Sequence, residues 1–166
     1  PYHFMTRITS VTGPYQGMAV GSTVDVEYDV PAHAWYFAGG TMPVAVLMEI
    51  ALQPCGWLGC YVGSPVQIDT ELLFRNLDGD LRVLREIRPG AATVHTSARL
   101  TTASHVNNMI IESFAIECAV DGEPLLRGTA VFGYFAPEAF AEQPGLPGAS
   151  PPEGTGTPTP VHGDPM

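Results

Sequence analysis

The segment from Thr41 to Val62, TMPVAVLMEIALQPCGWLGCYV, is the most apolar run in the chain and the feature that most constrains its fold. Pro43 suits the first turn of a helix, where a missing N–H costs nothing, and Thr41 just before it can cap the helix. The residues that follow leave almost no polar face. A helix that is apolar all round is buried in a domain or spans a membrane. We predict that the rest of the chain is built around this helix.

A membrane span is the less favoured of these two interpretations. The run is close to the roughly 20 residues that a span needs. However, no basic residues flank it, and polar, proline and glycine residues interrupt it. These are Glu49, Gln53, Pro54, Gly56 and Gly59. We therefore expect a helix buried in a soluble domain, with no membrane partner.

Glu49 and Gln53 lie one helical turn apart and share a face of the predicted helix. They are its only strongly polar side chains. Two interpretations remain open. Glu49 lies where the helix emerges into solvent, or it is an acid held in an apolar pocket, where burial raises its pKa and prepares it for proton transfer.

Composition and charge narrow the classes of function. The chain of 166 residues suits one domain, and its net charge of −10 argues against binding to nucleic acid or to an anionic membrane. The three cysteines, Cys55, Cys60 and Cys118, lack the spacing of metal ligands, so we expect buried thiols in a reducing cytoplasm and no metal site. No signal peptide is visible, and the start at Pro1 suggests a piece of a longer polypeptide.

The order of the remaining elements predicts an antiparallel sheet. The segment 21–30 alternates apolar and polar residues as a half-buried strand does, after a short turn and strand within 2–11. Asp121 and Gly122 give a strong hairpin signal between the last two strands, and a turn is predicted at 76–80. The strands after the helix are expected at 66–74, 81–87, 94–102, 109–120 and 125–135.

The composition changes after the last predicted strand. The stretch from Pro144 onward is rich in proline, glycine, serine and threonine and lacks aromatic residues. Such a sequence cannot bury enough apolar surface to order itself. We predict one domain over residues 1–137 and a disordered linker over residues 138–166.

The motifs along the chain resemble the FabA-like 3-hydroxyacyl-acyl-carrier-protein dehydratases. Similarity begins at Phe4-Met5-Thr6-Arg7-Ile8 and continues through the aromatic triplet Trp35-Tyr36-Phe37, the pair Met42-Pro43, Gly56-Trp57-Leu58-Gly59 and Val120-Asp121-Gly122. Within that family, the chain looks like the first hotdog of the paired dehydratase hotdogs of polyunsaturated fatty acid synthases and related iterative polyketide synthases. The resemblance implies an α+β hotdog fold, in which an antiparallel sheet wraps one long central helix.

The resemblance also implies a set of site residues. Glu49 stands at the position of the family's catalytic acid. Substrate-binding positions fall on Trp35, Tyr36, Phe37, Met42, Pro43, Val44 and Gln53. The implied partners are a second hotdog domain, fused or homodimeric, and a 3-hydroxyacyl substrate on an acyl carrier protein, which would dock on a basic patch such as Arg82, Arg85 and Arg88. No cofactor is implied.

The chain departs from the family pattern at two places. The family's Cys-His-Phe segment, which holds the catalytic histidine, is missing between Phe37 and Met42, and Val44 stands where the family has a glycine that approaches the thioester. His33 precedes the aromatic triplet, on the wrong side to replace that histidine. We interpret His3, His95 and His105 as structural or exposed.

Three hypotheses follow from these departures. The favoured one is half of a dehydratase, in which Glu49 serves the site of a partner hotdog that supplies the histidine. The second is a non-catalytic pseudo-dehydratase that supports folding and dimer geometry. The third is a hotdog acyl thioesterase, which can use a carboxylate on the central helix without a histidine.

Overall fold

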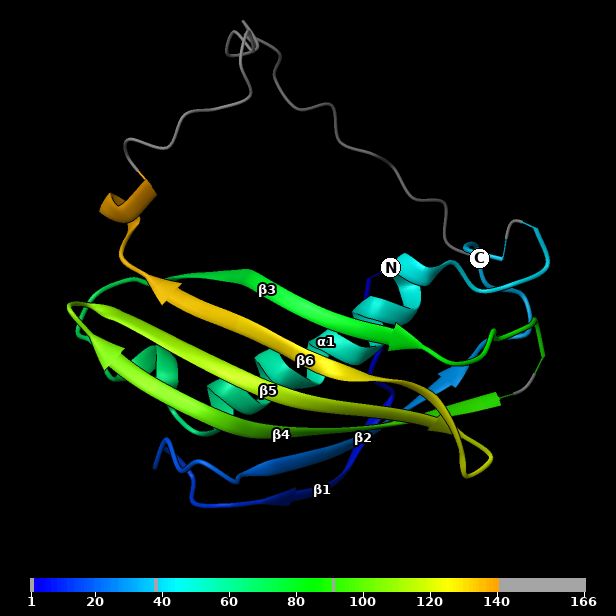
Figure 1. Cartoon of the computed structure of the whole chain (residues 1–166), viewed down its shortest axis with the longest axis horizontal. Helices are drawn as coiled ribbons and strands as arrows, with labels where there is room; N and C mark the ends of the chain where they lie inside the picture. The colour runs from blue at the N-terminus through cyan, green and yellow to red at the C-terminus, as the bar shows by residue number, and fades with distance from the viewer. Residues whose placement is uncertain (1, 38, 91, 141–166) are drawn as a thin grey trace, which may run out of the picture.

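A computed structural model describes residues 2–37, 39–90 and 92–140. Its six strands form one antiparallel sheet in the order β1-β2-β4-β5-β6-β3, and one long helix, α1, packs against the inner face of the sheet (Figure 1). The elements are β1 Arg7–Thr12, β2 Thr23–Val30, α1 Val44–Tyr61, the 3-10 turn η1 Ser64–Val66, β3 Leu73–Val83, β4 Ala92–Val106, β5 Met109–Val120, β6 Glu123–Phe135 and the 3-10 turn η2 Pro137–Phe140. This is the expected hotdog fold.

The core lies between α1 and the inner face of the sheet. Strand β2 shows the predicted alternation, with Val24, Val26 and Val30 buried toward the helix. On the helix, Ile50, Cys55 and Leu58 are completely buried. Because side chains alternate across a strand, each long strand contributes one apolar row to this core.

Helix α1 is less uniformly buried than the sequence suggests. It begins at Val44, so Pro43 is the residue that precedes the first turn, and no side chain caps the helix; the predicted cap by Thr41 is wrong. Val44 and Met48 are 55% and 38% exposed, which leaves one flank open to solvent. By length and composition alone α1 could cross a membrane, and 44% of it is buried inside the fold.

Strand β3 corrects the prediction for the segment after the helix. Two strands, at 66–74 and 81–87, and a turn at 76–80 were expected. Instead one strand runs from Leu73 to Val83 and pairs with β6 throughout, with a bulge between Asn76 and Asp78. The strand expected to begin at Val66 is replaced there by η1. The long strand β6 supplies pairing partners on both sides of the bulge, so a sequence typical of a turn is accommodated within a ladder.

The last hairpin agrees closely with the sequence. Strand β5 spans 109–120 as predicted, and β6 begins two residues earlier than expected. Asp121 and Gly122 have φ values of 53° and 78°. A two-residue turn with both φ values positive matches the twist of the flanking strands, which explains the Asp-Gly pair.

The last described residues lie at the predicted boundary between domain and linker. Residues 137–140 form η2, where the Phe140 ring lies 5.5 Å from that of Phe135 and the Arg75 guanidinium lies 4.9 Å from the Phe140 ring. The boundary between residues 137 and 138 stays a prediction. The rest of the predicted linker, residues 141–166, lies outside the described residues.

Candidate functional site

A groove of about 570 Å³ runs along the open flank of α1, between the helix and the edge strand β3. Its lining is mostly apolar, with one carboxylate. We call it the α1 groove. Its walls are formed by Tyr2, His3, Met5, Glu49, Leu52, Gln53, Gly56, Trp57, Cys60, Phe74, Asn76 and Phe132.

A second hollow, of about 240 Å³, lies beside the groove toward the start of α1. The two share Leu52 and Asn76, so they form a continuous strip along the helix. Phe74 and Val83 on β3 are 38% and 37% exposed along the same strip. The edge of β3 and the flank of α1 together therefore present apolar surface that no described residue covers.

Glu49 is the acid of this groove, and it is neither fully buried nor fully exposed. Its Oε2 accepts one long hydrogen bond, of 3.4 Å, from Nε2 of Gln53. Glu49 is therefore neither at a fully solvent-exposed end of the helix nor sealed in an apolar pocket, the two interpretations that the sequence leaves open. Within this chain Glu49 lines the mostly apolar groove and is partly exposed.

Gln53 fastens the N-terminal segment to α1. Its Oε1 accepts a hydrogen bond from the backbone N–H of Phe4 (2.9 Å), and its Nε2 donates to the carbonyl of Tyr2 (2.9 Å). The carboxamide predicted to bind substrate is thus engaged by the chain itself. The same two bonds flank His3, which the sequence analysis treats as structural and which the structure places, exposed, in the groove wall.

The aromatic triplet lies outside the groove lining. Tyr36 is only 4% exposed, and its hydroxyl is 3.0 Å from that of Tyr28 in the core. Burial and this hydrogen bond raise the pKa of Tyr36. Phe37 packs partly buried beside it, whereas Trp35 is 61% exposed with its ring 5.6 Å from that of Tyr2.

The residues at the start of the helix also divide between the core and the surface. Met42 is buried, and its backbone N–H donates to the carbonyl of Ile87 (2.7 Å). Pro43 and Val44 are exposed, and of the three only Val44 lines a hollow. The structure therefore brings together Glu49, Gln53 and Val44 along one strip and places Tyr36 and Met42 in the core.

The completely buried acid is Glu112 on β5, which the sequence analysis did not single out. Ser64 Oγ donates to its Oε1 at 2.5 Å, while its Oε2 and the hydroxyl of Tyr134 have no hydrogen-bond partner. Burial raises the pKa of Glu112, and the bond from Ser64 acts in the opposite direction. Strand alternation could have revealed it, because Glu112 stands between Ile110 and Phe114 in the inward row.

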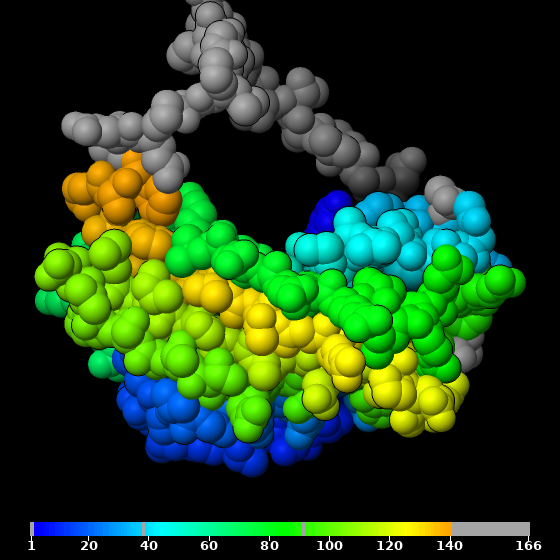
Figure 2. Space-filling view, in the orientation of Figure 1, coloured from blue at the N-terminus to red at the C-terminus, as the bar shows by residue number. Residues whose placement is uncertain are grey.

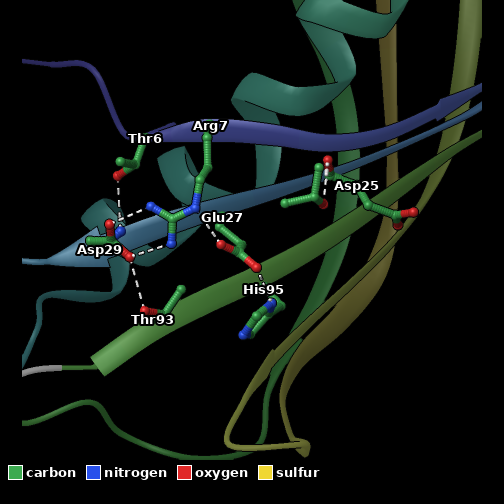
Figure 3. A network of polar contacts seen from close by, with 8 residues as sticks. Thr6, Arg7, Asp25, Glu27, Asp29, Thr93 and His95 are labelled. Carbon is green, nitrogen blue, oxygen red and sulfur yellow. Dashed lines mark hydrogen bonds and ion pairs between the residues drawn. The ribbon is translucent and has the colours of Figure 1, made fainter.

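The outer face of the sheet, turned toward the viewer in Figure 2, carries a different set of charges. Arg7 donates to Glu27 (2.5 Å) and to both oxygens of Asp29 (2.6 and 2.9 Å), and Nδ1 of His95 lies 3.2 Å from Glu27 (Figure 3). The hydrogen bonds from Arg7 and Thr93 lower the pKa of Asp29. A hollow of about 620 Å³ lies nearby, and His95 is the one of these residues that lines it. We place the candidate site in the α1 groove, because that groove contains the acid of the central helix.

The cysteines divide between core and groove. Cys55 and Cys118 are buried thiols as expected, with burial raising the pKa of Cys118 to about 11, whereas Cys60 is exposed and lines the groove. Among the described residues, no three His, Cys, Asp or Glu side chains gather closely enough to hold a metal ion.

Comparison by sequence finds one informative relative. The chain is 35% identical over 160 residues to one of the subunits of the polyunsaturated fatty acid synthase of Thraustochytrium sp. (strain ATCC 26185 / S-3), a match that covers 86% of this chain and 10% of that protein. The chain thus spans about a tenth of the length of this relative. No family model matches.

Comparison by structure finds similar folds at low sequence identity. The dehydratase heterocomplex ApeI:P from Xenorhabdus doucetiae superposes with a TM-score of 0.59 at 16% identity, covering 83% of this chain and 86% of that one. A hypothetical thioesterase with coenzyme A from Streptococcus pneumoniae TIGR4 gives a TM-score of 0.51 at 12% identity, covering 76% and 85%. These similarities show the fold.

Proposed function

We propose that this chain, a hotdog-fold domain related to a segment of a polyunsaturated fatty acid synthase, is one half of a 3-hydroxyacyl thioester dehydratase. The observation that carries the proposal is Glu49, the one carboxyl group in a mostly apolar groove along the central helix. An apolar groove suits an acyl chain, and a single acid suits proton transfer at one point along it.

The reaction needs two groups. A base removes a proton from C2 of the acyl thioester, and an acid protonates the hydroxyl at C3, which leaves as water while the C2–C3 double bond forms. Glu49 is the acid in this proposal. Its partial exposure and its hydrogen bond from Gln53 leave one oxygen free to face a substrate hydroxyl.

The base comes from a second hotdog domain, which covers the strip between α1 and β3. Two features support this assignment. The aromatic triplet and Met42 are separated by too short a segment to include the family's histidine. The strip exposes apolar residues from both elements, including Val44, Met48 and Phe74, which a partner domain would bury. The substrate would arrive on an acyl carrier protein.

The decisive experiment replaces Glu49 by glutamine in the intact protein that carries this domain. The variant keeps the shape and the hydrogen bond to Gln53 but cannot donate an acidic proton. We expect dehydration of a 3-hydroxyacyl thioester to fall by about a hundredfold or more, the usual size of a general-acid contribution. Glu117→Gln, on the outer face of the sheet, is the matched control and should retain the parent rate.

Three outcomes distinguish the alternatives. A parent rate in Glu49→Gln would make this domain a scaffold. Hydrolysis of a saturated acyl thioester that disappears with Glu49→Gln would identify a thioesterase. Because His3 lines the same groove, His3→Gln tests the source of the base: we expect a rate near that of the parent protein, and a loss as large as that of Glu49→Gln would place the base in this chain.

A further inference from the structure

Glu112 lies where four elements converge at the C-terminal end of α1. The carboxyl group comes from β5, the Ser64 hydroxyl from η1 and the Tyr134 hydroxyl from β6. Gly59 on α1 completes the cluster, because a Cβ at this position would overlap Tyr134 Oη and lie 2.8 Å from Glu112 Oε2. The helix can approach the two oxygens only because residue 59 has no side chain.

Among the residues that the structure describes, no positively charged side chain pairs with this carboxyl. Its partners in register on the neighbouring strands are Ala103 and Phe132, both apolar. Burial and a negative charge on this carboxyl raise the pKa of three nearby groups, the thiols of Cys55 and Cys60 on α1 and the hydroxyl of Tyr134 on β6. All three are acids, so none of them supplies a positive charge. A buried carboxylate without a cation is very costly, and such a group takes up a proton instead.

The hydrogen-bond pattern agrees with a protonated group. Oε1 already accepts from Ser64, whereas Oε2 and Tyr134 Oη are both buried, both unpartnered and both next to Gly59. An ionised carboxyl can only accept hydrogen bonds, but a protonated one can also donate from Oε2. A proton on Oε2 removes the charge from the oxygen that has no hydrogen bond and leaves Oε1 to accept from Ser64.

We propose that Glu112 is held as a neutral carboxylic acid with its proton on Oε2, and that its ionisation releases the C-terminal end of α1 from the sheet. The released end carries Gly56, Trp57 and Cys60, which line the α1 groove, so the protonation of Glu112 controls the shape of one end of that groove. This inference depends on the fold and the cluster, and it holds whether or not Glu49 is catalytic.

The test measures urea unfolding of the full chain as a function of pH. The native state binds a proton at Glu112 that the unfolded state loses near the ordinary pKa of 4.5. The contribution of Glu112 is therefore fully present below that pH and is lost as pH rises toward the pKa of the folded state. Glu112→Gln keeps the acceptor and the donor but cannot ionise. We expect the unfolding constant of the parent chain to rise relative to that of Glu112→Gln by up to about tenfold per pH unit in this window.

Matched variants make the result decisive. Glu117→Gln, on the same strand but the opposite face, should unfold with the pH dependence of the parent chain. Ser64→Ala keeps Glu112 and removes the bond that favours its ionised form, so the loss of stability should extend to higher pH; it also serves as the test if Glu112→Gln does not fold. Fluorescence of Trp57, which stacks on Tyr61 at 5.4 Å, should change across the same pH range in the parent chain and not in Glu112→Gln. A constant ratio of the two unfolding constants from about pH 4 to pH 8 would overturn the proposal, as would a Ser64→Ala profile identical to that of the parent chain.

Discussion

Two carboxyl groups beside the same helix differ because of what surrounds them. Glu49 is part of α1 itself, lies on its open flank and has one long hydrogen bond. Glu112 approaches α1 from β5, is completely buried and has a short bond from Ser64. In the functions proposed above, the partly exposed Glu49 meets a substrate, and the buried Glu112 holds the helix against the sheet. Burial, rather than residue type, separates the two roles.

The largest expected effect concerns activity alone. Glu49→Gln should lower the dehydration rate by about a hundredfold or more and leave the melting temperature within about 2 °C of the parent value, because its hydrogen bond is long and its side chain only partly buried. Thermal unfolding measured beside the rate assay checks this separation. A large drop in melting temperature would show that Glu49 supports the fold as Glu112 does.

The next effect concerns stability at the buried cluster. Gly59→Ala should lower the free energy of unfolding by about 1–3 kcal/mol, because the new methyl group collides with Tyr134 and Glu112. Gly56→Ala is the matched control on the same helix, since its Cβ would meet only the Phe74 ring at an ordinary distance of 3.6 Å. We expect this control to be neutral or stabilised by up to about 1 kcal/mol through helix propensity. Equal values for both variants, measured by urea unfolding, would contradict the close approach at Gly59.

A smaller effect is expected where Gln53 joins α1 to the N-terminal segment. Gln53→Ala removes the bonds to Phe4 and Tyr2 and should cost about 1–2 kcal/mol of stability. Hydrogen exchange of the Phe4 amide should accelerate while that of the core strands does not. If instead the fold is unaffected and only the rate falls, Gln53 acts on the substrate, as the family resemblance implies.

The smallest effect gives a pH dependence opposite in sign to that of Glu112. Hydrogen bonds from Arg7 and Thr93 lower the pKa of Asp29, so its contribution is present above its ordinary pKa and is lost as pH falls through the folded-state value. Asp29→Asn should therefore flatten the acid side of the stability profile only slightly, because the group is exposed to solvent. Glu112→Gln should alter the opposite side. If both variants changed the stability profile on the same side, acidic or alkaline, the difference in sign between Asp29 and Glu112 would be contradicted.

Periodicity in the sequence predicts the strands that turn one face to the core and the other face away from it. The alternation in β2, the span of β5 and the Asp121–Gly122 turn all follow from local rules, because a strand that covers a core needs every second residue apolar. The same rule places Glu112 inward. A polar residue in the inward row of a strand is as clear a signal of a buried site as one in a buried helix.

Tertiary structure decided what local rules could not. The segment 76–80 has the composition of a turn, yet it continues β3 because β6 offers it hydrogen bonds on both sides of the bulge. By sequence alone Gln53 is predicted to bind a ligand. In the fold its carboxamide is hydrogen-bonded to the backbone of Tyr2 and Phe4, which lie 49 or more positions away in the chain. The sequence by itself determined which residues face inward, because that depends on each segment's own period. Which inward and outward groups meet depended on contacts between segments distant in the chain, and only the folded arrangement of α1 against the sheet specifies those contacts.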